Sequence, residues 1–197
     1  MSLILNIDTA VDNATVSIAE NGNIIKAAFN NNQKEHATFL HIAIKQMFAS
    51  ASLRMNNLDA IAVTEGPGSY TGLRVGMSAA KGLCYALQKP LITICTLKMM
   101  AKDAVLNHGN EADLFCPMID ARRMEVFTSV FNSNLESVIE PCAMILNEHA
   151  FATLLNKNKI AFSGNGSSKL QHVLTSENVI FLPITDYANA LNLLSFE

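Results

Sequence analysis

The sequence predicts an α/β protein of two duplicated lobes, each a mixed β-sheet carrying helices. Two observations predict this fold. The apolar residues change along the chain between period two, which is typical of strands, and spacings of three and four, which are typical of helices. The order strand, strand, strand, helix, strand, glycine turn, helix also occurs twice, once in each half. The predicted boundary lies near 109–113, which gives lobes of residues 1–110 and 111–197.

The first half begins with three strands. An apolar run at Leu3–Ile7 is followed by alternation over 14–18, and Asn21-Gly22, a pair that favours a type I′ turn, returns the chain over 24–29. The remaining predicted elements of this half are a helix at 37–51, a strand at 60–64, a glycine turn at 66–69, a helix at 71–87 with Ser69 or Thr71 as N-cap, a short buried strand at 91–95, and a helix at 96–107 capped by Thr96.

The second half repeats this order. Its predicted elements are strands at 114–119, 124–131 and 135–139, a helix from an Asn147 cap to about 156, a strand at 160–163, a turn at 164–166, and a short helix that begins at Ser167 or Ser168. Each half therefore has enough strands for its own sheet. The helices between the strands predict that each sheet is packed against a layer of helices.

Composition limits the classes of function. The chain has 197 residues, of which 50% are hydrophobic and 16% charged, with a net charge of −3, and this excludes a disordered protein. Because 14 Lys and Arg stand against 17 Asp and Glu, no broad basic field is present, and direct binding of RNA or DNA is not expected. An apolar chain with so little charge fits a face that a partner covers.

The cysteines and the N-terminus point to a cytoplasmic location. The cysteines are widely spaced among apolar neighbours, which predicts reduced core residues: Cys84, Cys95, Cys116 and Cys142. The first residues lack the basic start of a signal peptide, and no apolar run approaches the length of about 18 residues that a membrane span requires. We expect a soluble protein that is not exported.

Two segments could hold a phosphate. The turn that contains Gly66, Gly68 and Ser69 leads from a strand into a helix, and Asp8-Thr9 ends the first strand, where open α/β sheets place their ligands. Both have a simpler interpretation, because the spacing matches no known phosphate loop. The turn then only aims the helix, and Asp8 caps the turn that follows it rather than holding a magnesium-bound water.

A stripe of small residues marks the predicted helix at 71–87. Gly72, Gly76 and Ala80 recur every four residues, and each interior glycine costs about 0.8–1.0 kcal/mol relative to alanine, so a close contact must compensate. The contact could be the helix's own sheet, the helix at 36–52, or another chain, and the pattern does not distinguish among these. The stripe therefore predicts packing rather than catalysis.

Other candidate chemical groups are not arranged for catalysis. His36 and His41 are five residues apart and fall on different faces of a helix, so no metal site is expected. No nucleophile elbow of the G-x-S-x-G type is present. The charged run from Asp120 to Glu125, with Arg122 and Arg123 at its centre, is expected to form local ion pairs on the surface.

Four segments carry a resemblance to a known family. Residues 4–9, 58–63, 66–76 with 80–83, and 120–127 resemble the TsaB family, whose members are partner subunits in bacterial tRNA threonylcarbamoyladenosine synthesis. The resemblance implies the actin-like ATPase-domain (ribonuclease H-like) fold of two duplicated lobes, which agrees with the repeated order of elements. Family members usually continue past 191–197 with a further helix and tail, so the second lobe is expected to be short at its end.

The resemblance also implies a function and partners. It implies a noncatalytic subunit that has no cofactor or metal and does not contact a membrane. The subunit is expected to form a heterodimer with TsaD, to join TsaE in a ternary complex, and to form a homodimer when alone. It is expected to contact tRNA only through the complex. The first two helices would form the interface, and a leucine at Gly76 is predicted to block association without unfolding the chain. The implied interface residues are Ala37, Leu40, Ile44, Met47, Gly72, Gly76, Ala79, Ala80 and Leu83. An alternative function is an ATP-dependent phosphotransferase or hydrolase of the actin-like superfamily; a metallopeptidase comes last.

Overall fold

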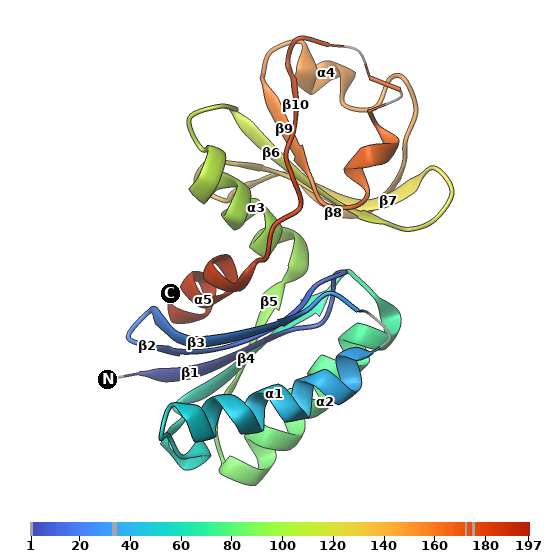
Figure 1. The fold of residues 1–197 in the computed structure, drawn as a ribbon. Helices are drawn as coiled ribbons and strands as arrows, with labels where there is room; N and C mark the ends of the chain where they lie inside the picture. Colours follow the sequence, from blue (N-terminus) through green and yellow to red (C-terminus); the bar gives the residue numbers. More distant parts are fainter. Residues whose placement is uncertain (1, 33–34, 172, 175) are drawn as a thin grey trace. The chain divides into compact units, whose positions relative to one another are not determined.

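The structure, a computed structural model, describes residues 2–32, 35–171, 173–174 and 176–197 and forms two compact units (Figure 1). The first unit runs to Thr96 and also contains Asp186–Glu197, while Leu97–Thr185 form the second unit. The chain is therefore divided earlier than the predicted lobes of 1–110 and 111–197. Its C-terminal segment belongs to the first unit rather than to the second.

The first unit contains a five-stranded mixed sheet. Its strands are β1 (Leu3–Asp8), β2 (Ala14–Glu20), β3 (Asn23–Asn30), β4 (Ala60–Gly66) and β5 (Leu91–Cys95), in the spatial order β3-β2-β1-β4-β5. The first three strands are antiparallel, and β4 and β5 run parallel to β1. Asn21 and Gly22 have φ of 50° and 76°, as the predicted type I′ turn requires.

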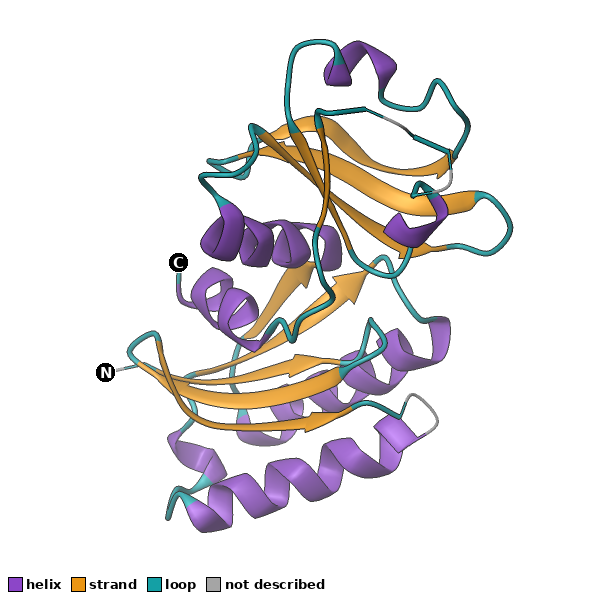
Figure 2. Cartoon of the chain, turned by 45° about the horizontal axis from the view of Figure 1, so that its top comes forward, coloured by secondary structure: helices purple, strands orange, loops and turns teal. Residues whose placement is uncertain are grey.

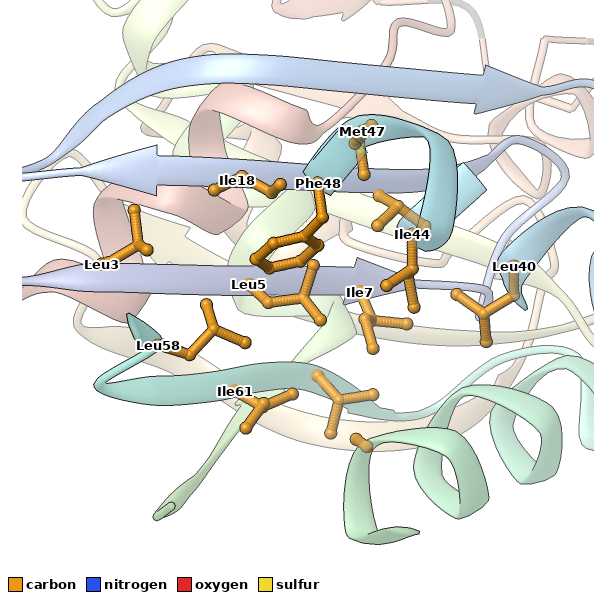
Figure 3. Close-up of a cluster of buried hydrophobic side chains, with 13 residues drawn as sticks. Leu3, Leu5, Ile7, Ile18, Leu40, Ile44, Met47, Phe48, Leu58 and Ile61 are labelled. Carbon is orange, nitrogen blue, oxygen red and sulfur yellow. The ribbon is translucent and has the colours of Figure 1, made fainter. Parts of the chain in front are cut away.

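Two long helices cover one face of this sheet, α1 (His36–Ser50) and α2 (Tyr70–Leu87), as Figures 1 and 2 show. Side chains of a strand alternate between the two faces of its sheet, so the odd-numbered residues of β1 point toward these helices. In Figure 3, Leu5 and Ile7 of β1 lie beside Ile44 and Phe48 of α1 in a buried cluster. This core fixes both helices against the sheet.

A helix that the sequence pattern did not predict, α5 (Ala188–Phe196), packs against the other face of the same sheet. Its contacts there include polar groups: the Ser195 hydroxyl donates to Asn6 Oδ1 at 2.6 Å, and Asn192 Nδ2 donates to the Gly22 carbonyl at 2.8 Å. The segment is short and its polar residues interrupt the apolar pattern, so only the sheet beneath it shows that this face is buried.

The second unit repeats the topology of the first. Its strands are β6 (Leu114–Asp120), β7 (Glu125–Asn132), β8 (Ser137–Ile145), β9 (Ile160–Ser163) and β10 (Val179–Phe181), in the order β10-β9-β6-β7-β8. Again the first three strands are antiparallel and the last two run parallel to the first. Each strand of one sheet has a counterpart at the same place in the other, which confirms the predicted duplication.

Helices in the second half are shorter than predicted. Asn147 Oδ1 accepts a hydrogen bond from His149 N at 2.9 Å, which forms a turn, and α4 (Ala152–Leu155) begins only after Phe151. The last predicted helix is the short 3-10 helix η3 (Ser167–Lys169), and another, η2 (Met55–Asn57), precedes β4. Helix α3 (Thr96–His108) follows the prediction, but the Thr96 hydroxyl has no hydrogen-bond partner in the structure and does not cap it.

Two predictions about burial are wrong. In β5 only Ile94 is buried, because β5 is the last strand of its sheet. Cys116 is buried and Cys84 and Cys95 are half-buried, but Cys142 is exposed on the edge strand β8. All four thiols are free. None of the helices in the described part of the chain has the length and apolarity needed to cross a membrane.

Candidate functional site

Asp8 lies at the end of β1 in a buried polar site. One of its oxygens, Oδ1, accepts hydrogen bonds from Ala10 N at 2.9 Å and from the Thr64 hydroxyl at 2.7 Å. The other oxygen, Oδ2, is buried and has no partner in the structure. The hydrogen bond to Ala10 is the turn cap that the sequence predicted for this residue.

Burial controls the ionisation of Asp8. The loss of water around the carboxyl group raises its pKa from 3.8 to about 6, although the hydrogen bonds from Ala10 and Thr64 lower it in part. The ionised form is therefore held at a cost near neutral pH. A buried carboxyl group with one unpartnered oxygen is the strongest chemical feature of this strand end.

The five candidate phosphate residues do lie together, but the turn is closed against the chain itself. Ser69 N donates to the Ala10 carbonyl at 2.7 Å, and the Thr9 hydroxyl donates to the Gly72 carbonyl at 2.6 Å. A Cβ atom at Gly68 would collide with the Ala10 carbonyl, so the turn packs closely against the residues that follow β1. The geometry favours the simpler interpretation, in which the turn aims α2.

Ser69 is the N-cap of α2, since its Oγ accepts a hydrogen bond from Gly72 N at 3.3 Å. Gly66, which ends β4, has φ of 117°, a conformation that favours glycine at the start of this turn. Ser69 and Gly66 thus serve the geometry of the strand-to-helix connection.

Asp120 is the counterpart of Asp8 in the duplicated unit, because β6 corresponds to β1. It is exposed, and Lys169 Nζ lies 2.6 Å from its Oδ1. This hydrogen bond lowers the pKa of Asp120. The predicted local pairing with Arg122 and Arg123 is wrong: the ion pair of Asp120 is with Lys169, on η3, and both arginines have positive φ in the turn after β6.

The small-residue stripe of α2 packs against the chain's own sheet. A Cβ atom at Gly72 would collide with the Thr9 carbonyl, and one at Gly76 would collide with the Thr9 hydroxyl. Ala80 is fully buried in the same core. The stripe therefore lets α2 approach the end of β1, and the prediction that a leucine at Gly76 leaves the fold intact is contradicted by this contact.

Burial also corrects the predicted interface. Six of the nine implied residues point into the core of the first unit and cannot meet a partner: Leu40, Ile44, Met47, Gly72, Gly76 and Ala80. The other three remain accessible, since Ala37 is exposed and Ala79 and Leu83 are half-buried. The predicted interface therefore consists mainly of residues on the inward faces of α1 and α2.

The outward face of α1 and α2 has the side chains that interfaces favour. Tyr70 and Tyr85 of α2 are 68% and 82% exposed, and the Arg74 guanidinium lies 3.9 Å from the centre of the Tyr70 ring. A groove of about 560 Å³ runs between the two helices, lined by Ala37, His41, Tyr70, Thr71, Arg74, Val75, Ser78 and Ala79. We call this surface the α1/α2 face.

The sequence contained a signal for this face. Tyr70, Arg74, Ser78 and Tyr85 recur at spacings of four and seven on α2, opposite the glycine stripe. Gly82 is exposed on the same side, and a Cβ atom added there would meet nothing within 4 Å, so this position is open to a neighbour. Large amphipathic side chains on the side away from the small residues would have identified the outward face.

The histidines of α1 lie on different faces, as the sequence predicted: His36 is buried and His41 exposed. Burial lowers the pKa of His36, and the Asp12 backbone opposes this shift. Within residues 2–32, 35–171, 173–174 and 176–197, no group of three His, Cys, Asp or Glu side chains is placed to hold a metal ion.

The chain is similar to proteins of tRNA modification. The model of the family described as "TsaD: tRNA N6-adenosine threonylcarbamoyltransferase" matches residues 24–193. The "tRNA threonylcarbamoyladenosine biosynthesis protein TsaB" of Bacillus subtilis is 27% identical over 169 residues, which are 84% of this chain and 72% of that protein. The protein of the same name from Haemophilus influenzae is 35% identical over 127 residues, 64% of this chain and 52% of that protein. The chain thus spans between half and three quarters of the length of these relatives.

Solved structures show the same fold. YeaZ from Pseudomonas aeruginosa superposes with a TM-score of 0.85 over 100% of this chain and 92% of that chain, at 22% identity. An inorganic polyphosphate/ATP-glucomannokinase from Arthrobacter sp. strain KM reaches a TM-score of 0.53 at 9% identity, covering 100% of this chain and 98% of that chain. The predicted two-lobed, actin-like fold is therefore confirmed.

Proposed function

We propose that the chain, which belongs to the TsaD family and is a TsaB (YeaZ-type) member of it, is a noncatalytic subunit of tRNA threonylcarbamoyladenosine synthesis. In this function the chain binds a TsaD-type transferase and activates it. The similarity to relatives named TsaB supports a role of this chain in tRNA modification. The α1/α2 face supports the binding.

The observation that carries this proposal is the exposure of Tyr70, Arg74 and Tyr85 on one side of α2. Tyrosine and arginine are the residue types that contribute most to binding energy at protein interfaces. The exposed Gly82 and the half-buried Ala79 leave room for a partner helix to approach. A rigid helix pair with large anchors and small spacers is suited to docking another helical surface.

The strand-end site supports a noncatalytic subunit. Its turn packs directly against Ala10. A group that binds phosphate needs free backbone donors, whereas Ser69 N is already bonded to the Ala10 carbonyl. The TsaE contact, the homodimer and the indirect contact with tRNA remain predictions of the family resemblance.

A substitution at Gly82 tests the docking directly. Gly82→Trp puts a large side chain on the α1/α2 face where a Cβ meets no other atom, so the fold should tolerate it. Gly82→Ala is the matched control. Each variant is mixed with the TsaD-type protein of the same organism, and co-elution and the yield of modified tRNA are measured. We expect the tryptophan variant to lose both while remaining folded, and the alanine variant to retain both. Co-elution of the tryptophan variant at wild-type strength would contradict the proposal.

A second candidate is an ATP-dependent phosphotransferase or hydrolase, favoured by the unpartnered Oδ2 of Asp8 at a strand end. Calorimetry of the isolated chain with magnesium and ATP distinguishes the two. Tight binding that Asp8→Asn abolishes would support this enzyme, and no binding would support the noncatalytic subunit.

A further inference from the structure

The turn between β6 and β7 presents two arginines to solvent. Arg122 and Arg123 are exposed, and neither forms an ion pair with any residue in the described part of the chain. Of the two acidic residues in this run, Asp120 is paired with Lys169, and Glu125 is half-buried. Both guanidinium groups are therefore available to an anion from outside the chain.

Hydrogen bonds from both sides hold this turn in place. Asp120 Oδ1 accepts a hydrogen bond from Arg122 N at 2.5 Å, and Asp120 N donates to Asn165 Oδ1 at 2.8 Å. Lys169 Nζ also donates to the Glu125 carbonyl at 2.8 Å, so one lysine bonds to both ends of the run. Because the backbone that carries the arginines is ordered before a ligand arrives, less conformational entropy is lost on binding.

The backbone conformation of the turn is unfavourable for arginine. Arg122 and Arg123 have φ of 71° and 48°, in the left-handed region that residues other than glycine, asparagine and aspartate rarely adopt. The turn between β2 and β3 has positive φ at Asn21 and Gly22, where residues that favour this conformation occupy it. Asparagine or glycine would form the β6–β7 turn at a lower cost, so the two arginines indicate a role of their side chains.

A phosphate group is the ligand that suits this pair. A guanidinium binds phosphate with two parallel hydrogen bonds and keeps its charge at neutral pH. The RNA substrate of the proposed function carries such groups along its whole backbone. Two arginines neutralise few phosphates, and the chain as a whole has a net charge of −3, so this contact is useful only where another protein holds most of the RNA.

We propose that Arg122 and Arg123 bind backbone phosphates of tRNA when the chain is in a complex with the TsaD-type transferase. This inference rests on the proposed function, because it names a contact between that complex and its substrate. The contact positions the RNA without reading its bases, since phosphate contacts carry no sequence information. It also gives the second unit a role separate from that of the α1/α2 face, which belongs to the first unit.

Variants of the full chain separate this role from a structural one. Arg122→Asn combined with Arg123→Asn removes both charges and introduces residues that tolerate a positive φ. Arg122→Lys combined with Arg123→Lys keeps both charges. Lys157→Asn is the control, because it removes a positive charge from an exposed position elsewhere in the second unit.

Each variant is combined with the TsaD-type protein of the same organism, and the affinity of the complex for an unmodified transcript of a substrate tRNA is measured at several NaCl concentrations. The affinity of each variant for the TsaD-type protein itself is measured by calorimetry. Urea unfolding of each isolated variant is followed by circular dichroism.

We expect the asparagine pair to weaken tRNA binding by roughly tenfold at about 0.1 M salt, and to lower the slope of log affinity against log salt by about 1.5. The lysine pair should keep the slope of the wild type, and Lys157→Asn should change neither quantity. The urea midpoint of the asparagine pair should equal or exceed that of the wild type, because the backbone strain is relieved.

The inference is overturned if the asparagine pair binds tRNA with the affinity and salt slope of the wild type. It is also overturned if the asparagine pair loses affinity for the TsaD-type protein instead, because the arginines then bind a protein surface. In both cases the proposed function stands, since the wild-type chain still forms the complex. If the wild-type chain does not bind the TsaD-type protein, the proposed function fails and this inference fails with it.

Discussion

Replacement of Asp8 by asparagine should make the protein more stable at neutral pH. Asparagine keeps an oxygen that can accept the hydrogen bonds from Ala10 N and Thr64, but it carries no charge to desolvate. The pKa of Asp8 is raised from 3.8 to about 6, and one pKa unit corresponds to 1.36 kcal/mol. Ionised Asp8 therefore costs the folded state roughly 3 kcal/mol at pH 7.5.

The pH dependence has a definite sign. Because the folded-state pKa lies above the unfolded one, the folded protein binds more protons between pH 3.8 and about 6, and the wild type loses stability as the pH rises through this window. Asparagine does not titrate. The advantage of Asp8→Asn should therefore be roughly 3 kcal/mol at pH 7.5 and less than about 1 kcal/mol at pH 4.

Urea unfolding followed by tyrosine fluorescence measures this difference. The chain has no tryptophan, and its three tyrosines, Tyr70, Tyr85 and Tyr187, all belong to the first unit, so the signal reports the unit that contains Asp8. Asp120→Asn is the matched control, because the duplicated residue is exposed and paired with Lys169 and should lose about 0–1 kcal/mol at pH 7.5. This reasoning would be refuted by an Asp8→Asn variant that is less stable than the wild type at pH 7.5. It would also be refuted if the free energy of unfolding of the variant exceeded that of the wild type by the same amount at both pH values.

Three further substitutions or measurements test the packing. Gly76→Leu should destabilise the first unit by more than about 3 kcal/mol, since its side chain collides with Thr9, and a cooperative urea transition at the wild-type midpoint would contradict this. Ser195→Ala removes the hydroxyl that donates to buried Asn6 and should cost about 1–3 kcal/mol, a loss that Ser133→Ala in an exposed turn should not reproduce. Cys142 should react with a thiol reagent in the native protein while Cys116 does not, because Cys116 is buried and its pKa is raised to about 12; mass spectrometry of trapped peptides that finds Cys116 modified first would disprove the expectation.

Most strands were predicted from local sequence because their signals are local, whereas β10 (Val179–Phe181) was not predicted. The alternation in β2 and the Asn21-Gly22 turn each depend on neighbouring residues, and the repeated order of elements is visible without any long-range contact. Local signals failed where a segment depends on what lies against it. The helix expected from Asn147 is mostly a turn, and α5 is buried only because a sheet lies beneath it.

The candidate site also combines features that local sequence predicts with features that only tertiary contacts determine. The glycine stripe of α2 correctly predicted a close contact, but the pattern of side chains on a helix does not say what the helix meets. The structure shows that Thr9 fills that contact, so the exposed side of α2 is the opposite one, with Tyr70 and Tyr85. Likewise Asp8 and Asp120 end equivalent strands, yet one is buried and the other is paired with Lys169.

By itself the sequence determined the class of fold and the duplication, because periodicity and turn residues act over a few positions. The tertiary structure alone decided which face of α2 is exposed, which unit contains Ala188–Phe196, and that burial raises the pKa of Asp8. Each of these depends on burial, and burial is set by segments far apart in the chain.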